Sequence, residues 1–419
     1  MPPNNDSYNP DELDAPQWLN TKFIREVLVQ HLKAPELKVI DLKFSPASSK
    51  GDHYASLMFR AYVEYETQKG HSTISLVIKT MPEQDGHKKE LLGESHIFET
   101  EIAMYTKVLP KFENVLREVG DMTRLCATCI YHSVKPRQVM VFEDLSTQGY
   151  AVIRRSANIE ELRAALENLA KWHAVSHKLL KEQPELFDQL QYDITTLPKF
   201  LEQDFLTKSM DNFIDMLGNV ESLKSYRKYF EPMQNKLIQG WVDVIREYRE
   251  SRQENGYYVL CHGDFHLRNM MFKGTECMLL DFQMSYVGSM ANDIIYAIYM
   301  LFDGKLREEK SNELIYNYFQ TFVNTLKKIG YLGKVPSLVE FRRQMFEKRY
   351  NDFLLLTSFQ PIIIYMRKGA DAGDIMEDDE LRSKLYYQKE YIKELEDLLP
   401  RMLHLGYFEP LYSCRVNSV

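Results

Sequence analysis

The chain has 419 residues, more than one hydrophobic core usually supports, so we expect two domains or one domain with two lobes. With 44% hydrophobic and 27% charged residues it has the composition of a globular protein, which excludes a disordered or fibrous chain. Lysine and arginine total 52 against 60 aspartate and glutamate residues, and the net charge of −8 argues against a nucleic-acid ligand.

Three features of the sequence predict a cytoplasmic protein. Residues 1–16 are polar and acidic, whereas a signal peptide is basic and then apolar. The most apolar stretches, 294–302 and 353–366, are too short or too interrupted to span a bilayer. The five cysteines are few and odd in number, which fits a reducing compartment better than a disulfide framework.

The first part of the chain predicts a helix and then a β-hairpin. Apolar residues at helical spacing between 18 and 32 predict a helix that caps a sheet. From Tyr54 apolar and polar residues alternate as in a strand, and a second alternating run ends near Lys79. The segment before the hairpin, with Ser49 and Gly51, is the candidate phosphate-binding loop, although a plain surface turn fits it equally well.

The boundary between two lobes is predicted after the next helix and strand. Residues 88–109 have helical spacing, and Pro110 is expected to end that helix. A short apolar strand follows at 138–142, after which the composition turns polar and a glycine appears. The predicted units are an N-terminal lobe over 1–142, a hinge over 143–149 and a helical C-terminal lobe over 150–419.

The C-terminal lobe is expected to be helical apart from one hairpin. Its first helix starts at a capping-box-like pattern over 158–161. Residues 270–272 and 277–280 are short apolar runs that predict two paired strands. Because a hairpin folds the chain back on itself, Asn269 at its entry and Asp281 at its exit are expected to be neighbours. Oxygen atoms of both then face one Mg²⁺ ion.

The strongest chemical signal is a motif with the spacing of a phosphoryl-transfer site: HGDFHLRN at 262–269 and DFQ at 281–283. In kinases one Asp accepts the proton of the substrate hydroxyl, an Asn five residues on binds metal, and a later Asp binds metal against the phosphates. Asp264, Asn269 and Asp281 have that order and spacing. The alternative is a chance His-Gly-Asp turn, but the matching Asn and the hairpin make it the minority interpretation.

Lys79 is predicted to position the phosphates, since it ends its strand as the phosphate-binding lysine of kinases does. The alternative is a solvated surface lysine, which is the usual state of a lysine at a strand end. The functional interpretation requires a carboxylate partner from the following helix. Glu101 is the predicted partner because it shares a helical face with apolar residues, whereas Glu99 is expected to be exposed.

Further residues are predicted to support the structure. His262 is expected to brace its loop by hydrogen bonding, and Asp293 to start a helix or brace a loop. Trp172 and His173, on a long helix, are expected to be core residues. The two cysteines of the segment 126–129 have no second Cys or His pair at zinc-finger spacing, so they are interpreted as small buried hydrophobes.

The phosphoryl acceptor is expected to be a small molecule. Only about a dozen residues separate Asp281 from the apolar helix at Ile294, and no Ala-Pro-Glu element follows, so a protein-kinase activation segment has no room. The helices from Ile294 to about Leu405 are rich in Tyr, Phe and Met, as an apolar pocket for a steroid-like or lipid-like alcohol requires. A helical core is the safer interpretation of the same residues.

Several groups of residues together form a recognisable pattern: Gly51-Asp52-x-Tyr54-Ala55-Ser56, Phe98-x-x-Glu101-Ile102 with Tyr105 and Leu109-Pro110, Glu143-Asp144-Leu145, His262-Gly263-Asp264 with Asn269, and Asp281-Phe282-Gln283. They resemble the ecdysteroid kinase-like family of insects, in the choline kinase and aminoglycoside phosphotransferase branch of the kinase fold. The resemblance covers roughly residues 20 to 410, and every matched position is intact.

The resemblance implies an α+β, bilobal protein kinase-like fold that uses ATP and Mg²⁺ to phosphorylate a small-molecule hydroxyl, ecdysteroids being the named example. A xenobiotic or plant-derived alcohol is the alternative acceptor, and a nucleotide-binding steroid carrier or sensor without turnover is the alternative of another class. The residue roles that the likeness implies are Asp264 as catalytic base, Asn269 and Asp281 as metal ligands, Lys79 and Glu101 as the phosphate-positioning pair, and Glu143 to Leu145 as the hinge that meets adenine through backbone groups.

Overall fold

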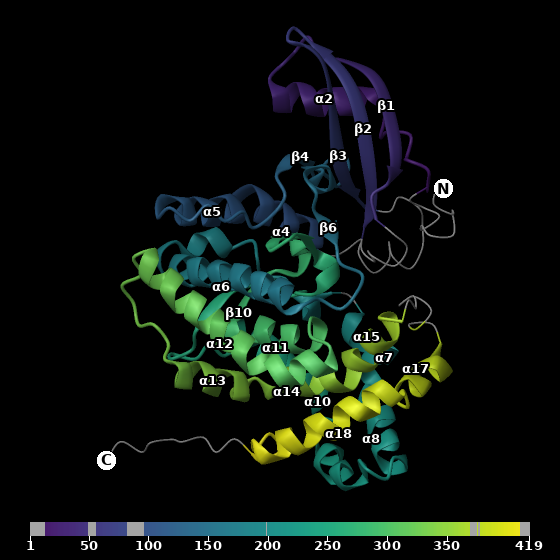
Figure 1. Cartoon of the computed structure of the whole chain (residues 1–419), viewed down its shortest axis with the longest axis vertical. Helices are drawn as coiled ribbons and strands as arrows, with labels where there is room; N and C mark the ends of the chain where they lie inside the picture. The colour runs from purple at the N-terminus through teal and green to yellow at the C-terminus, as the bar shows by residue number, and fades with distance from the viewer. Residues whose placement is uncertain are drawn as a thin grey trace.

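The structure, a computed structural model, describes residues 13–48, 56–81, 96–197, 199–368, 375 and 378–410. A small lobe with a long twisted sheet stands on a larger lobe built mainly of helices (Figure 1). The α+β, bilobal architecture predicted from the sequence is therefore confirmed.

The small lobe contains a five-stranded antiparallel sheet in the order β1-β2-β3-β5-β4. The predicted hairpin is its centre, and Thr67 pairs with Gly70 across the turn. The predicted strand at 138–142 is β5. The first and last strands of the sheet were not predicted. The first does carry a strand signal, since Ile40, Leu42 and Phe44 alternate with polar residues, whereas the last shows no clear alternation. The five strands are β1 (Lys38–Pro46), β2 (Leu57–Thr67), β3 (Gly70–Thr80), β4 (Cys129–Ser133) and β5 (Val139–Glu143).

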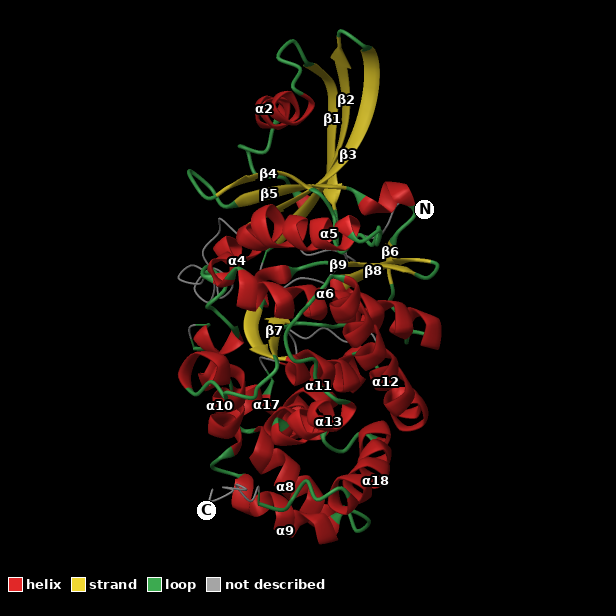
Figure 2. Cartoon of the chain, turned by 90° about the vertical axis from the view of Figure 1, so that its left-hand side faces the viewer, coloured by secondary structure: helices red, strands yellow, loops and turns green. Residues whose placement is uncertain are grey.

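One face of this sheet is covered by α2 (Thr21–Leu32), which lies beside the long strands (Figure 2). The helix begins at Thr21 and not at Trp18, because the Asn20 side chain accepts hydrogen bonds from the first free N–H groups. Alternate residues of β2 and β3, such as Phe59 and Ile78, are buried against α2. Since neighbouring residues of a strand point to opposite faces, Lys79 lies on the face that looks away from α2.

A long helical segment connects β3 with β4 and contradicts one prediction. It consists of α4 (Ile97–Ala103), a π-helical turn (Met104–Val108) and α5 (Leu109–Glu118). Pro110 therefore does not end the helix but lies in the first turn of α5. The reason is the π turn, which inserts one extra residue before the proline, so that the missing N–H and the ring are accommodated. The predicted start at residue 88 lies outside the described residues.

The larger lobe is organised around α6 (Ile159–Glu182), which packs against α12 (Figures 1 and 2). The predicted capping box of α6 is present between Asn158 and Glu161. The other helices of this lobe are α7 (Asp204–Thr207), α8 (Ser209–Asn219), α9 (Arg227–Phe230), α10 (Leu237–Glu250), α11 (Met290–Met300), α12 (Gly304–Lys328), α13 (Leu338–Glu347), α14 (Arg349–Leu354), α15 (Gln360–Met366), α17 (Asp379–Leu385) and α18 (Lys389–His404).

Two small antiparallel sheets lie within the larger lobe. One pairs β7 (Tyr258–Cys261) with β10 (Tyr286–Ser289). The other joins β6 (Ala151–Val152) to the predicted hairpin of β8 (Met270–Lys273) and β9 (Glu276–Leu279). Every residue of β7 and β10 is buried, so the loops that leave these strands start from fixed positions.

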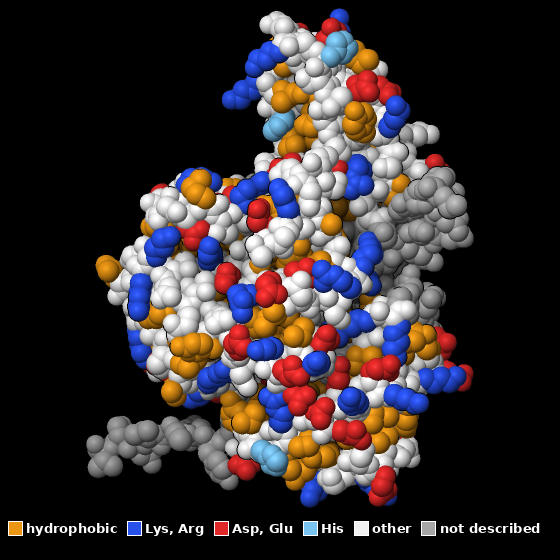
Figure 3. All heavy atoms as spheres, in the orientation of Figure 1, with side chains coloured by type: hydrophobic (Ala, Val, Ile, Leu, Met, Phe, Trp, Pro, Cys, Tyr) orange, Lys and Arg blue, Asp and Glu red, His pale blue; other side chains and the backbone are white. Residues whose placement is uncertain are grey.

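The surface carries charges of both signs. On the face shown in Figure 3, Lys and Arg side chains are interspersed with Asp and Glu side chains over the larger lobe. This pattern differs from the broad basic surface that binds a nucleic-acid backbone. Across the residues that the structure describes, no helix combines the length and apolar character needed to cross a membrane.

Candidate active site

The HGD motif leaves the buried strand β7 as a tight loop. Gly263 has φ 83°, in the left-handed region that favours glycine. A Cβ atom at this position would overlap the backbone carbonyl of Met284, three residues after Asp281. A glycine is therefore required, because it lets the loop that carries Asp264 lie directly against the segment that follows Asp281.

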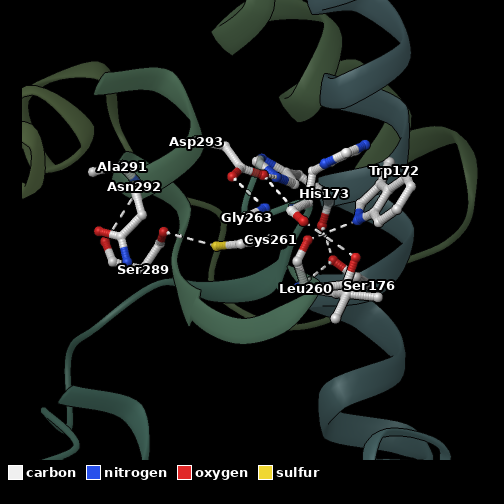
Figure 4. A network of polar contacts seen from close by, with 12 residues as sticks. Trp172, His173, Ser176, Leu260, Cys261, Gly263, Ser289, Ala291, Asn292 and Asp293 are labelled. Carbon is white, nitrogen blue, oxygen red and sulfur yellow. Dashed lines mark hydrogen bonds and ion pairs between the residues drawn. The ribbon is translucent and has the colours of Figure 1, made fainter. Parts of the chain in front are cut away.

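Asp293, at the start of α11, holds this loop from beneath. Its carboxylate accepts hydrogen bonds from the backbone N–H groups of His262 (2.6 Å) and Gly263 (3.1 Å). The predicted loop-bracing role of Asp293 is confirmed. The His173 ring lies 3.1 Å from the same carboxylate through Nε2 (Figure 4). Its Nδ1 lies 2.6 Å from the Tyr318 hydroxyl. His173 is buried, as predicted for a core residue, but it also links α6 and α12 to the loop.

Asp264 lies in a dense set of hydrogen bonds. One oxygen, Oδ2, accepts a bond from Asn269 Nδ2 (2.9 Å) and lies 3.3 Å from His266 Nε2. The other oxygen, Oδ1, accepts a bond from the Tyr296 hydroxyl (2.7 Å). Burial by itself would raise the pKa of Asp264, but His266 and Tyr296 outweigh it and hold the pKa well below its usual value. The carboxylate is therefore ionised and oriented.

Lys79 contacts the buried carboxylate of Glu101 and, across the lobes, the partly buried carboxylate of Asp281. Its Nζ lies 2.6 Å from Glu101 Oε2 and 2.8 Å from Asp281 Oδ1. Lys79 is 3% exposed and Glu101 1% exposed, whereas Glu99 is exposed. The structure thus brings Lys79 and the predicted partner Glu101 into contact and excludes the solvated alternative.

The charges of this cluster influence one another strongly. Burial would lower the pKa of Lys79, but the carboxylates of Asp281 and Glu101 outweigh it and raise that pKa, so the lysine is cationic. Burial, together with the charge of Asp281, raises the pKa of Glu101 to about 7 against the opposing effect of Lys79. One cation between two carboxylates leaves a net negative charge when both are ionised. Such a site favours a further cation.

Asn269 and Asp281 are neighbours, as the hairpin predicted. The backbone N–H of Leu280 donates to the Asn269 carbonyl (2.9 Å), and His262 Nε2 lies 3.0 Å from the Leu280 carbonyl. The predicted bracing by His262 is therefore confirmed. Asp281 itself has φ 61° and ψ 68°, an uncommon conformation for a residue other than glycine, and such conformations are found mostly at functional sites.

The donor atoms fit a divalent metal ion. Asn269 uses its side-chain nitrogen for Asp264, both at the carboxylate and at the backbone carbonyl (3.0 Å), which leaves its carbonyl oxygen as the atom to offer a metal. Asp281 adds carboxylate oxygens, the ligand type that Mg²⁺ prefers. Within the described part of the chain no cluster of three or more His, Cys, Asp or Glu side chains is arranged to hold a metal. A metal here would complete its shell with phosphates and water, as Mg²⁺ in kinase sites does.

Side-chain hydrogen bonds tie the predicted hinge to the small lobe. The Glu143 carboxylate accepts hydrogen bonds from Thr128 N (2.6 Å) and Gln148 Nε2 (2.7 Å), and Leu145 is buried. Asp144, whose role was missed, accepts bonds from Arg60 Nε (2.8 Å) and Ser75 Oγ (2.7 Å) of the sheet. A cavity of about 580 Å³ lies at this segment, and it includes Arg60, Tyr62, Ser75, Glu143, Asp144 and Gln148 in its lining.

The two phosphate-loop candidates, Ser49 and Gly51, lie outside the described residues. Their assignment as nucleotide-binding residues stays a prediction, as do the roles of Glu143 and Leu145.

A narrow cavity of about 40 Å³ borders the HGD loop at Gly263 on the side of the C-terminal helices. Its lining is mainly aromatic and aliphatic, and it includes Trp241, Tyr296, Leu354, Leu355 and Phe359. Most Tyr, Phe and Met side chains of these helices are buried in the main hydrophobic core, which agrees with the safer of the two interpretations of the sequence. The contact of Tyr296 with Asp264 was also not predicted, although Tyr296 lies one helical turn after Asp293 and therefore on the same face of the helix.

The model of the ecdysteroid kinase-like family matches residues 50–331, which is well over half of the chain. The chain belongs to the ecdysteroid kinase-like family. As a member of this family it is a small-molecule kinase, an ATP-dependent phosphotransferase that acts on a hydroxyl group. No curated protein matches the chain in sequence.

Several solved structures of kinases are similar to this family member at low identity. A choline kinase from Cryptosporidium parvum Iowa II has a TM-score of 0.44 and 9% identity, and the match covers 93% of this chain and 98% of that one. A microcompartment-associated aminopropanol kinase has a TM-score of 0.43 and 13% identity, with 93% and 99% covered. An aminoglycoside phosphotransferase from Alicyclobacillus acidocaldarius has a TM-score of 0.37 and 12% identity, with 82% and 90% covered. At such TM-scores these structures carry no inference about what this chain binds.

Proposed function

We propose that this ecdysteroid kinase-like protein transfers the γ-phosphoryl group of ATP, bound with Mg²⁺, to a hydroxyl group of a small apolar alcohol. An ecdysteroid is the favoured acceptor. The observation that carries the proposal is the meeting of Asp264, Asn269, Asp281 and Lys79 at one point between the lobes, linked by the hydrogen bonds described above.

In the proposed reaction the acceptor oxygen forms a bond to the γ-phosphorus while the bond between that phosphorus and the bridging oxygen of ADP breaks. The proton of the acceptor hydroxyl goes to Asp264. The low pKa of this carboxylate keeps it ionised, so it orients the hydroxyl and takes its proton as negative charge moves onto the phosphoryl group. Positioning therefore contributes more to the rate than the basicity of Asp264.

The other site residues would neutralise and place the nucleotide. Asn269 and Asp281 would hold Mg²⁺, which supplies charge neutralisation on the phosphates when it is bound. Lys79 would contact the phosphates while Glu101 keeps its ammonium group in place. We assign the nucleotide to the interface of a lobe over 1–142 and a lobe over 150–419.

The base of the nucleotide would lie at the hinge over 143–149. Backbone groups of Glu143 and Leu145 are the proposed contacts, and the cavity at this segment leaves room for a ligand. Ser49 and Gly51 are the proposed phosphate-loop residues. The cytoplasm stays the proposed compartment, which agrees with the free state of the four cysteines in the described part of the chain.

The acceptor side supports an apolar molecule. The cavity beside the proposed catalytic loop is lined mainly by aromatic and aliphatic side chains, and its polar part consists of Gly263, Asn292, Asp293 and Asn351. Its volume of about 40 Å³ is far below the roughly 300 Å³ at which ligand pockets begin, so only part of a steroid-sized acceptor would enter it without movement of side chains. Xenobiotic or plant-derived alcohols are the alternative acceptors, because an apolar lining suits them as well as a steroid.

The test is a panel of hydroxylated small molecules, ecdysteroids and xenobiotic alcohols together, assayed for Mg·ATP-dependent phosphate incorporation. Asp264→Asn should lower turnover by a factor of about 10² to 10⁴ while ATP still binds. Substantial residual phosphorylation would remove Asp264 from the role of base. A steroid carrier or sensor predicts the opposite pattern, namely steroid binding with no consumption of ATP.

A further inference from the structure

Hydrogen-bond partners already occupy three of the four lone-pair positions of the Asp264 carboxylate. Asn269 and His266 lie at Oδ2, and the phenol of Tyr296 donates to Oδ1 at 2.7 Å. That phenol O–H makes the same kind of contact that an acceptor O–H has to make before it loses its proton. The acceptor hydroxyl must therefore share Oδ1 with Tyr296 or displace it.

Tyr296 also separates Asp264 from the apolar cavity. It lies on α11 one turn beyond Asp293, and its side chain belongs to the lining of the cavity that borders Gly263. α11 is held in place because Asp293 binds the loop, so the Tyr296 side chain is the part that can turn away. Movement of its ring would open the narrow cavity next to the carboxylate.

We propose that Tyr296 is a guard residue of the acceptor site: its hydroxyl occupies Asp264 Oδ1 until the hydroxyl of an apolar acceptor displaces it. The proposal rests on the proposed function, since it assumes that Asp264 receives the proton of the acceptor. An apolar acceptor gains contact area in the cavity when the ring moves, which offsets the lost hydrogen bond. A water molecule gains no apolar contact area in the cavity, so nothing offsets the hydrogen bond that Tyr296 would lose to it.

The consequence concerns hydrolysis of ATP. If water were placed at Oδ1, its oxygen would bond to the γ-phosphorus, the bond to the bridging oxygen of ADP would break, and its proton would pass to Asp264. The products would be ADP and inorganic phosphate. With Tyr296 at Oδ1, water is kept from this position and ATP is preserved until the acceptor arrives.

The experiment measures Mg·ATP hydrolysis by the full-length protein without any acceptor. Tyr296→Phe keeps the ring and removes only the hydroxyl, so hydrolysis should rise about tenfold, the size expected for loss of a hydrogen bond to a charged group. The double variant Tyr296→Phe with Asp264→Asn should lose this increase, because the proton acceptor is gone. Tyr296→Met serves as a second variant should the first fail to fold, and it should show the same rise.

Tyr299→Phe is the matched control. Tyr299 lies on the same helix, is more deeply buried than Tyr296, and donates its hydroxyl to Asp352 (3.2 Å) and not to Asp264. Hydrolysis by this variant should equal that of the unchanged protein. A purely structural role of Tyr296 predicts hydrolysis that is unchanged or lower in Tyr296→Phe, and that result would overturn the guard proposal.

A second readout uses whichever alcohol the panel identifies as acceptor. The KM for that alcohol should fall several-fold in Tyr296→Phe with kcat little changed, since the competing donor is gone; a higher KM would contradict the proposal. Failure of the guard proposal is distinct from failure of the proposed function. In the first case the unchanged protein phosphorylates an alcohol but the variants show no gain, and in the second it phosphorylates none.

Discussion

Replacing Lys79 with methionine should destabilise the protein and weaken its binding of Mg·ATP. The substitution leaves Glu101 and Asp281 facing each other without the ammonium group that lies 2.6 and 2.8 Å from them. The side chains of Lys79 and Glu101 are only 4% and 2% exposed, so solvent screens this loss very little. Removing one partner of such a buried pair costs about 3–5 kcal/mol.

The loss of stability in Lys79→Met should depend on pH, and the protonation of Glu101 determines the direction of this dependence. Its pKa is raised to about 7 in the native state, so the folded protein holds this proton more tightly than the unfolded chain. The stability that protonated Glu101 contributes is fully present below the pKa of Glu101 in the unfolded chain, near the ordinary value of 4.5. This contribution is lost as pH rises through about 7. Without Lys79 the pKa of Glu101 rises further. The destabilisation should therefore be small near pH 5 and largest at pH 8.

Thermal unfolding at several pH values measures this difference. A loss of about 3 kcal/mol corresponds to a fall in Tm of roughly 3 °C at pH 8 for a chain of 419 residues. Isothermal titration with Mg·ATP should show an affinity at least about tenfold lower, because a charge-assisted contact to the phosphates is lost. The matched control is Lys171→Met, which breaks a partly exposed ion pair with Asp121 (2.9 Å) and should cost about 1 kcal/mol or less without changing nucleotide affinity. A pH-independent loss, or unchanged affinity for Mg·ATP, would refute the reasoning.

Three further substitutions test other parts of the site. Asp281→Ala should weaken binding of Mg·ATP but have less effect on ATP without metal, and equal affinities for Mg·ATP before and after the change would remove Asp281 from the metal site. Asp293→Asn should lower kcat about tenfold or more and leave the KM for ATP nearly unchanged. The reason is that an amide replaces the carboxylate that accepts hydrogen bonds from His262 N and Gly263 N. Full activity in a steady-state assay would contradict the bracing role of Asp293. Gly263→Ala should reduce turnover even more strongly, because the φ of 83° and the nearby Met284 carbonyl leave no room for a methyl group. A variant with unchanged activity and stability would show that the loop is not held at this position.

Much of this site could be predicted because its parts are close together in the sequence. The turn between β8 and β9 alone makes Asn269 and Asp281 neighbours, and the alternation along β3 alone places Lys79 on the face opposite Ile78. The choice of Glu101 over Glu99 needed only the helical period. Each of these inferences depends on one element and its own repeat.

The missed features depend on contacts between elements. Asp144 belongs to the predicted hinge, but its bonds to Arg60 and Ser75 join residues more than sixty positions apart in the chain, so no local pattern predicts them. The bond from Tyr296 to Asp264 and the link from His173 through Asp293 to the loop join different elements of the larger lobe. Pro110 was misread because the local rule that proline ends a helix gave way to the π turn before it.

The sequence by itself determined the class of chemistry, because the spacing of the proposed base, the two proposed metal ligands and a strand-end lysine is set by short segments with strong local preferences. Only the tertiary structure decided the burial, the hydrogen-bond partners and the charge interactions of these groups. The buried charge cluster of Lys79, Glu101 and Asp281 exists because two lobes close over it, and burial makes its charges interact strongly. Likewise, Asp264 meets Tyr296 only because α11 packs against the HGD loop.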